Sequence, residues 1–230
     1  MFDWISAHKD ILQTLASVGS FLIWLIYAQL LYFGFRRQRR PRLIINRGKR
    51  KNLDALCVIS NMSAEPIYLQ HIMMTLETSK GDWTLDVSDH EADLEDDHSD
   101  QERTPDGRCT HQGPLDSGGF VHIGSFNALK QRIIDIAGLD DKEGMKDDLV
   151  LKAMCVRVIG TYCSENLPIG AERRFVFHQT DDSCTLVPET WDTLQFSTRR
   201  QRRELKRDIK RIHERQAQGE GEEPEREQGD

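Results

Sequence analysis

The sequence is poor in aromatic residues and in cysteine, and it lacks the short motifs that mark common catalytic centres. Aromatic residues make up 7% of the 230 residues, and the five cysteines include no CxxC pair. Neither a disulfide framework nor a regular zinc site is therefore predicted. The sequence also has no GxSxG turn and no glycine-rich phosphate loop followed by lysine. Because these motifs position a nucleophile or a nucleotide, we expect a protein that is not an enzyme and has no cofactor.

The overall charge argues against a dedicated nucleic-acid binder. The chain has 31 basic and 38 acidic residues, which gives a net charge of −7. A polyanion would be repelled by such a balance unless the basic residues were gathered in one place. The two signs are in fact segregated along the chain, so each segment is considered separately.

One long segment has no charge at all. Residues 11–35 form a run of 25 uncharged residues in a chain of which 30% is charged. As a helix this run would be about 37 Å long, enough to cross a hydrocarbon core of about 30 Å. We therefore predict a single transmembrane helix over residues 11–35, which excludes a simple soluble protein.

The flanks of this helix predict its orientation. Residues 1–10 contain one lysine and two aspartates, whereas residues 36–42 contain five arginines. The positive-inside rule then places residues 1–10 outside and the C-terminal bulk in the cytosol. A cleaved signal peptide would have its basic cluster before the apolar run, so we expect an uncleaved anchor in the inner (plasma) membrane.

Residues 43–196 carry recurring strand patterns and few helix patterns. Apolar and polar residues alternate through Trp83, Leu85 and Val87, and Tyr68 is expected to share one strand face with Ile72, Met74 and Leu76. Turn residues at 61–66 and 79–82 separate the first three strands, which are expected to form a meander. The predicted strands cover residues 56–59, 68–76, 82–88, 120–123, 149–159 and 175–178.

One helix is expected to interrupt the strands. Ser125 is a plausible N-cap, apolar residues follow at helical spacing, and Gly138 is placed to end the helix. The predicted fold class is mainly β, a two-layer β-sandwich-like (Ig-like) domain with one inserted helix. A small barrel is the alternative.

Two short stretches carry a resemblance. They are the segment Asn61-Met62-Ser63-Ala64-Glu65-Pro66-Ile67-Tyr68 and the segment Arg39-Arg40-Pro41-Arg42 before Leu43-Ile44-Ile45. With them the first third of the chain resembles uncharacterised bacterial inner-membrane proteins that have one N-terminal span and a cytosolic β domain. The resemblance implies a bacterial inner-membrane setting and a sandwich-like fold, and it implies no activity and no catalytic residues.

Residues 86–106 form an acidic segment with ten acidic residues against Arg103 alone. Such a segment resists packing, so we predict a mobile loop. A metal site is the alternative, because the segment and the residues just beyond it contain side chains that can bind metals, among them His90, His98, Cys109 and His111. Their spacing fits no regular metal-binding pattern. Cys155 and Cys163 lie in or beside an apolar strand and are expected to be buried and inert.

The C-terminal region contains a basic amphipathic helix. Residues 197–216 contain nine basic residues against three acidic ones, a balance of +6, and Leu205, Ile209 and Ile212 form an apolar stripe. Residues 217–230 are expected to be a disordered acidic tail. The helix is the predicted membrane-surface or partner-binding site, with the residues Arg199, Arg200, Arg202, Arg203, Leu205, Lys206, Arg207, Ile209, Lys210, Arg211 and Ile212.

Three surfaces could accept this helix: an anionic lipid leaflet, a nucleic acid, or the domain or a protein partner on which its stripe packs. Nucleic acid is the least favoured, because no aromatic residue is interleaved for base stacking. The predicted function is a membrane-anchored cytosolic binding or scaffold module for a protein at the inner membrane. The alternatives are a membrane-associated sensor or effector whose β domain recognises a small ligand, and a metal-dependent enzyme if the acidic-loop residues converge.

Overall fold

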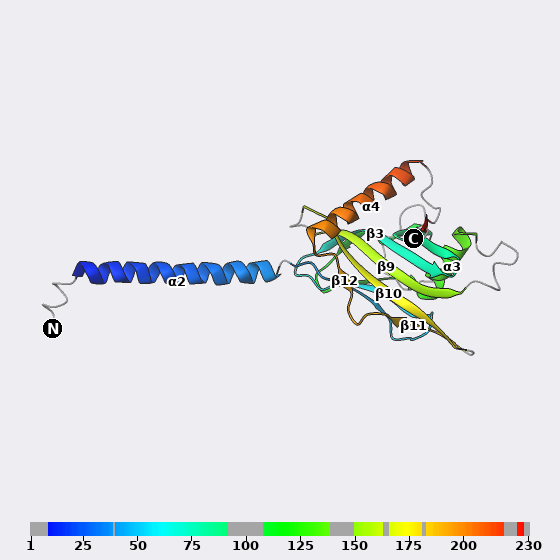
Figure 1. Ribbon diagram of the computed structural model, residues 1–230, viewed down its shortest axis with the longest axis horizontal. Coiled ribbons are helices and arrows are strands. Elements are labelled where there is room, and N and C mark those ends of the chain that lie inside the picture. The colour runs from blue at the N-terminus through cyan, green and yellow to red at the C-terminus, as the bar shows by residue number, and fades with distance from the viewer. Residues whose placement is uncertain are drawn as a thin grey trace. The chain divides into compact units, whose positions relative to one another are not determined.

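The computed structural model describes residues 9–38, 40–91, 108–138, 150–162, 166–180, 183–218 and 225–227. It contains two compact units, residues 1–40 and residues 41–230. The first holds helix α2 (Lys9–Gln38), and the second holds every described strand together with two further helices (Figure 1).

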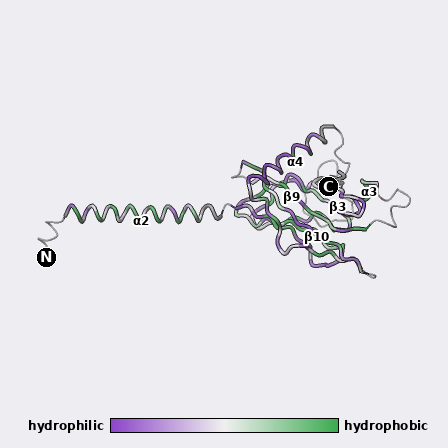
Figure 2. The backbone as a smooth tube through the Cα atoms, viewed as in Figure 1, coloured by the Kyte–Doolittle hydropathy of each residue, from purple (hydrophilic) through white to green (hydrophobic). Residues whose placement is uncertain are grey.

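Helix α2 confirms that the predicted apolar segment is helical. Its portion Gln13–Gly34 is long and apolar enough to cross a membrane, which suggests a single-pass membrane protein. Hydrophobic turns recur along it in Figure 2, and Trp24 and Leu31 are among its exposed side chains. The helix is longer than the predicted span because Lys9, Asp10 and the first arginines after Phe35 extend it at both ends.

Two antiparallel sheets build the second unit. The smaller has the strand order β1-β2-β8, and the larger has the order β11-β10-β9-β3-β4-β13, with β12 paired to β10 and β7 paired to β3. The small-sheet strands are β1 (Leu43–Arg47), β2 (Leu56–Asn61) and β8 (Phe120–Ser125). Those of the large sheet are β3 (Ile67–Thr78), β4 (Gly81–Asp86), β7 (Gly113–Leu115), β9 (Leu151–Tyr162), β10 (Ile169–Thr180), β11 (Ser183–Pro188), β12 (Leu194–Gln195) and β13 (Glu225–Glu227).

Both sheets contribute to one hydrophobic core. Ile45 and Ile59 of the small sheet, and Met74, Val156 and Phe175 of the large sheet, are fully buried members of it. Burial alternates along β1 and along most of β3, as expected for strands with one apolar face. The fold is therefore mainly β, and two sheets that share a core are compatible with the predicted two-layer sandwich.

The inserted helix is confirmed as α3 (Phe126–Ile136). The hydroxyl of Ser125 caps it by accepting a hydrogen bond from the Ala128 amide at 3.2 Å. The chain leaves the helix through Gly138, whose φ of +59° is a left-handed conformation that favours glycine. Phe126 is buried, and its ring centroid lies 4.9 Å from that of Phe175, which ties the helix to the core.

Two details of the first strands differ from the sequence prediction. Strand β2 pairs with β1 and β8 and not with β3, so the turn after Asn61 carries the chain from one sheet to the other and the expected meander is wrong. Tyr68 is exposed, whereas Ile72, Met74 and Leu76 are buried. The register of β3 against β9 shifts between Leu69 and His71, and such a bulge moves the preceding residues to the opposite face.

The acidic segments are partly structured where the structure describes them. The first and last parts of the acidic loop pair as β5 (Asp89–Glu91) and β6 (Arg108–Thr110), and residues 92–107 lie outside the described residues. In the predicted disordered tail, α4 (Arg199–Gln218) extends two residues beyond Gln216, and β13 pairs with β4. Backbone pairing orders these acidic residues because it does not require their side chains to be buried.

Candidate functional site: the basic face of helix α4

Helix α4 packs on β10 through one leucine. Leu205 is 2% exposed, and Gly170 of β10 lies directly beneath it. A Cβ atom at Gly170 would lie 2.6 Å from Cδ1 of Leu205 and 2.7 Å from Cδ2 of Phe196, closer than such atoms can approach. The missing side chain of Gly170 therefore makes the room that Leu205 and Phe196 fill.

Polar contacts fix how the helix is rotated on the sheet. Arg157 of β9 donates a hydrogen bond to Glu172 at 2.7 Å and lies 3.7 Å from a carboxylate oxygen of Asp208 on α4. Its guanidinium carbon is 5.7 Å from the centroid of the Phe196 ring. Burial would lower the pKa of Arg157, but the charge and hydrogen bond of Glu172 raise it. These groups are partly solvated, so they orient α4 more than they stabilise it.

The first turn of α4 has a capping box that the sequence analysis missed. The Thr198 hydroxyl accepts a hydrogen bond from the Gln201 amide at 3.3 Å, and the Gln201 side chain accepts one from the Thr198 amide at 3.1 Å. This reciprocal pair matches the pattern Thr-x-x-Gln, which is visible in the sequence. It sets the helix start one turn before the buried Arg202 and two turns before the buried Leu205.

The structure separates the predicted site residues into two groups. Arg202 and Leu205 are buried, and Ile209 and Ile212 are half-buried. The apolar stripe therefore faces the domain, and α4 is drawn mostly in hydrophilic colours in Figure 2. The exposed members of the predicted site are all basic, namely Arg199, Arg200, Arg203, Lys206, Arg207, Lys210 and Arg211.

Few acidic groups neutralise this basic face. Arg200 pairs with Glu204 at 3.5 Å and Lys210 pairs with Glu214 at 3.3 Å, both one helical turn apart. Asp208 is half-buried and lies 3.7 Å from Arg157 and 3.9 Å from Arg211, so it is shared between the sheet and the basic face. Such exposed pairs are individually weak, so the face keeps a strong positive potential that can attract an anionic surface.

A second polar cluster joins the end of β4 to β3. The Asp86 carboxylate contacts Nδ1 of His71 at 2.7 Å and accepts hydrogen bonds from the amide and hydroxyl of Ser88. Burial would raise the pKa of Asp86, but the hydrogen bonds from His71 and Ser88 lower it below its ordinary value. In a nucleophile triad the serine would bond to the histidine, whereas Ser88 bonds to the carboxylate. The cluster therefore has the connectivity of a structural anchor.

The thiols of Cys57 and Cys155 do not have the character of reactive centres. Burial raises the pKa of the Cys57 thiol, and it raises that of Cys155 to about 12, with a further rise from the charge of Glu172. Both stay protonated at neutral pH and are poor nucleophiles. Cys163 lies outside the described residues. Within the described residues, no three His, Cys, Asp or Glu side chains come together as metal ligands, and His98 lies outside them.

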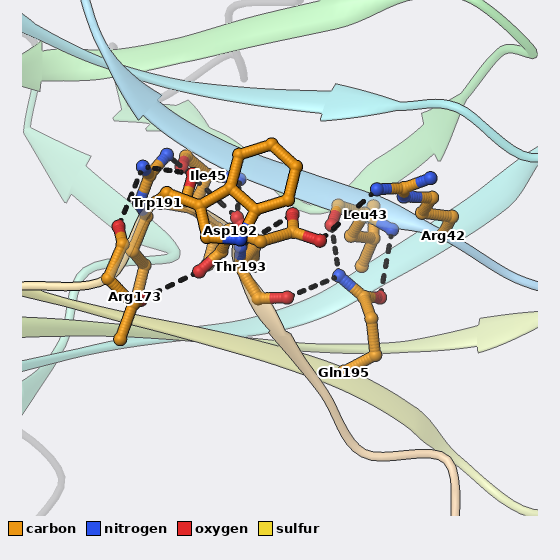
Figure 3. Close-up of polar contacts among 9 residues, drawn as sticks. Arg42, Leu43, Ile45, Arg173, Trp191, Asp192, Thr193 and Gln195 are labelled. Atoms are coloured by element: carbon orange, nitrogen blue, oxygen red, sulfur yellow. Dashed lines mark hydrogen bonds and ion pairs between the residues drawn. The ribbon is translucent and has the colours of Figure 1, made fainter. Parts of the chain in front are cut away.

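Side chains close the open edge of β1 (Figure 3). The Gln195 carboxamide accepts a hydrogen bond from the Leu43 amide at 3.2 Å and donates one to the Leu43 carbonyl. The Thr193 hydroxyl accepts from the Ile45 amide at 3.0 Å and donates to the Ile45 carbonyl at 3.3 Å. Both side chains thus satisfy backbone groups that a further strand would otherwise satisfy.

Arg173 reinforces the same seam. Its guanidinium donates to the Ile45 carbonyl at 2.7 Å and to the carbonyls of Thr190 and Trp191 at 3.1 and 3.0 Å. The side chain is 6% exposed, and burial lowers its pKa. It binds three carbonyl oxygens, so its charge serves to hold the loop at residues 190–193 against β1.

Comparisons with models of protein families, with curated proteins and with solved structures find no match to this chain.

Proposed function

We propose that this chain is a single-pass inner-membrane protein whose cytosolic β domain docks an acidic protein partner on helix α4. The observation that supports the proposal is the burial of Leu205. It commits the apolar stripe of α4 to the domain and leaves seven basic side chains facing outward. A face of this kind recognises a partner by charge, because the apolar groups that would enter a lipid layer are buried at Leu205 and half-buried at Ile209 and Ile212.

The membrane anchor determines the place in the cell where the domain would bind this partner. Helix α2 has the length and composition of a membrane span, and five arginines lie in residues 36–42. By the positive-inside rule the domain and α4 belong in the cytosol, in the bacterial inner-membrane setting that the resemblance implies. A tethered domain meets partners at the membrane at a high effective concentration, so a weak charged surface is sufficient.

The orientation is tested by thiol labelling of intact cells. Because Cys57 is buried and Cys155 is half-buried, an exposed probe is needed, and His178→Cys on β10 provides it in a chain whose five native cysteines are changed to alanine. An impermeant reagent should miss this cysteine in intact cells and label it after permeabilisation. Asp3→Cys should be labelled in both conditions. Labelling of His178→Cys from outside would refute the cytosolic placement.

The docking face is tested by photo-crosslinking in cells. A photoreactive amino acid at Lys206 of the full-length protein should crosslink to a protein. Reversing the charges of Arg203, Arg207 and Lys210 should abolish that product, whereas reversing Lys49, Arg50 and Lys51 in the loop after β1 should not. The control residues are equally exposed and equally basic. Crosslinks only to lipid, or products that survive reversal on α4, would refute the proposal.

A further inference from the structure

Three large apolar side chains in the β domain are exposed without any role in the docking face. Trp191 is 92% exposed, Phe120 is 69% exposed and Met62 is 58% exposed. We call these three residues the apolar rim. Single exposed apolar residues are common on proteins, so the question is whether these three lie together.

Met62 and the neighbour of Trp191 contact Arg42, and Phe120 lies on the same sheet as β1. The Met62 amide donates to the Arg42 carbonyl at 2.8 Å, and Asp192, the residue after Trp191, pairs with the Arg42 guanidinium at 3.2 Å. On the small sheet, Ser60 of β2 pairs with Ile44 of β1 on one side and with Phe120 of β8 on the other. Phe120 is therefore two strand spacings, about 10 Å, from β1. The rim therefore flanks the first residues of β1 on both sides.

The backbone that carries the rim is held firmly. The buried Asn61 side chain donates to the carbonyls of Glu65 and Leu115 at 3.0 and 2.9 Å, and its backbone amide bonds to the Gly119 carbonyl at 2.9 Å. These bonds fix the turn that contains Met62 and the turn that precedes Phe120. On the other side, Arg173 holds the Trp191 carbonyl. The rim is thus presented by an ordered scaffold.

The covalent chain places this scaffold close to the end of α2. Helix α2 ends at Gln38, and β1 begins at Leu43. Four extended residues span at most about 14 Å, so Arg42 lies within that reach of the helix end however the two units are oriented. The covalent chain therefore holds the residues that the rim flanks within this reach of the end of α2.

We infer that the apolar rim rests in the headgroup and upper acyl region of the membrane that α2 crosses. The inference rests on the proposed membrane anchor and adds a second, peripheral contact to it. Tryptophan is favoured at this depth because its ring is apolar and its N–H is polar. Arg42, which is exposed beside the rim, suits the phosphate groups at the same level.

Depth-dependent fluorescence quenching tests this placement in the full-length protein. Single-tryptophan variants, with the other tryptophans changed to phenylalanine, are reconstituted in bilayers that carry a nitroxide high on the acyl chain, and Trp24, which lies at the middle of the span, is also measured with a nitroxide near the chain end. Trp191 should lose emission to the nitroxide. The Trp24 variant reports the span, and the control is His178→Trp. Position 178 is exposed and far from the rim. Ala171 pairs with β12 near the rim, and residue 178 lies seven residues further along β10, a distance of about 23 Å.

The outcomes separate this inference from the anchor itself. Quenching of Trp24 and Trp191 but not of the His178→Trp probe would support the rim contact. Quenching of Trp24 alone would overturn the rim contact and leave the anchor intact. No quenching of Trp24 would overturn both. If Trp191 is protected from aqueous iodide but untouched by the lipid nitroxide, another protein surface covers it and the inference is wrong.

Discussion

Replacing Leu205 by alanine should release helix α4 from the β domain. Leu205 is 2% exposed and fills the space above Gly170, so the truncation removes most of the apolar contact between α4 and β10. Leucine-to-alanine changes at buried sites cost about 2–5 kcal/mol. Because α4 lies at the periphery and can relax, we take about 2 kcal/mol, which lowers the ratio of docked to undocked helix by a factor of about 30.

Hydrogen exchange of the α4 amides measures this ratio directly. A helix of 20 residues has little stability without packing, so its amides exchange whenever it undocks. Protection from Leu205 to Ile212 should fall about 30-fold, or to its limit, while the core strands keep theirs. Trypsin should also cut faster after the arginines of α4. Leu194→Ala is the matched control, because Leu194 is 53% exposed and its loss should cost less than about 0.5 kcal/mol.

Equal protection in the two variants would refute the reasoning. It would mean that Leu205 does not hold the helix and that the direction of the basic face does not follow from its burial. Gly170→Ala gives an independent check, since the added Cβ would meet Leu205 and Phe196 and should undock the same helix without touching its sequence.

Three further predictions concern the polar clusters of the β domain and use urea unfolding of the full chain. Arg173→Met should lower the free energy of unfolding by at least about 3 kcal/mol, because several buried acceptors lose their donor, whereas the exposed Lys152→Met should be neutral. The pKa of Asp86 is lowered in the fold, so its contribution to the free energy of unfolding is complete at pH values above its ordinary pKa of 3.8. The free energy of unfolding that Asp86→Asn loses relative to the unchanged chain should therefore shrink as the pH falls below about 4. Asn61→Asp removes two donors to carbonyls and should cost about 2 kcal/mol or more, while the exposed Asn127→Asp should cost less than about 0.5 kcal/mol.

Much of the local structure could be predicted because its signals are local. The uncharged run, the Ser125 cap and Gly138 each act within a few residues, and α2 and α3 form where they indicate. Apolar patterns likewise indicate six strands, β2, β3, β4, β8, β9 and β10, whereas β1, β11 and the shortest strands are not predicted. The prediction that the turn after Asn61 joins two paired strands is wrong, because a five-residue turn suits a hairpin and a crossing between sheets equally well. The choice depends on Asn61 bonding to the Leu115 carbonyl, 54 residues away.

The seam at β1 could not be predicted for the same reason. Thr193 and Gln195 act on β1 from about 150 residues away, and nothing in their own neighbourhood indicates that their side chains replace a strand. The bulge at Gln70 is similar, since it appears only in the register with β9. Long-range pairing decides these features, and a single sequence carries little trace of it.

Helix α4 shows how one such contact changes a functional argument. Its stripe of Leu205, Ile209 and Ile212 fits a lipid layer as well as it fits the domain, and the pattern alone does not choose. Gly170 makes the difference, because only a residue without a side chain lets Leu205 reach the sheet. Once the stripe is covered, binding on α4 depends on its exposed charges. Charges of this kind are screened over about 8 Å at physiological ionic strength, so affinity on this face should fall steeply with salt, whereas an inserted stripe would hold its partner at high salt.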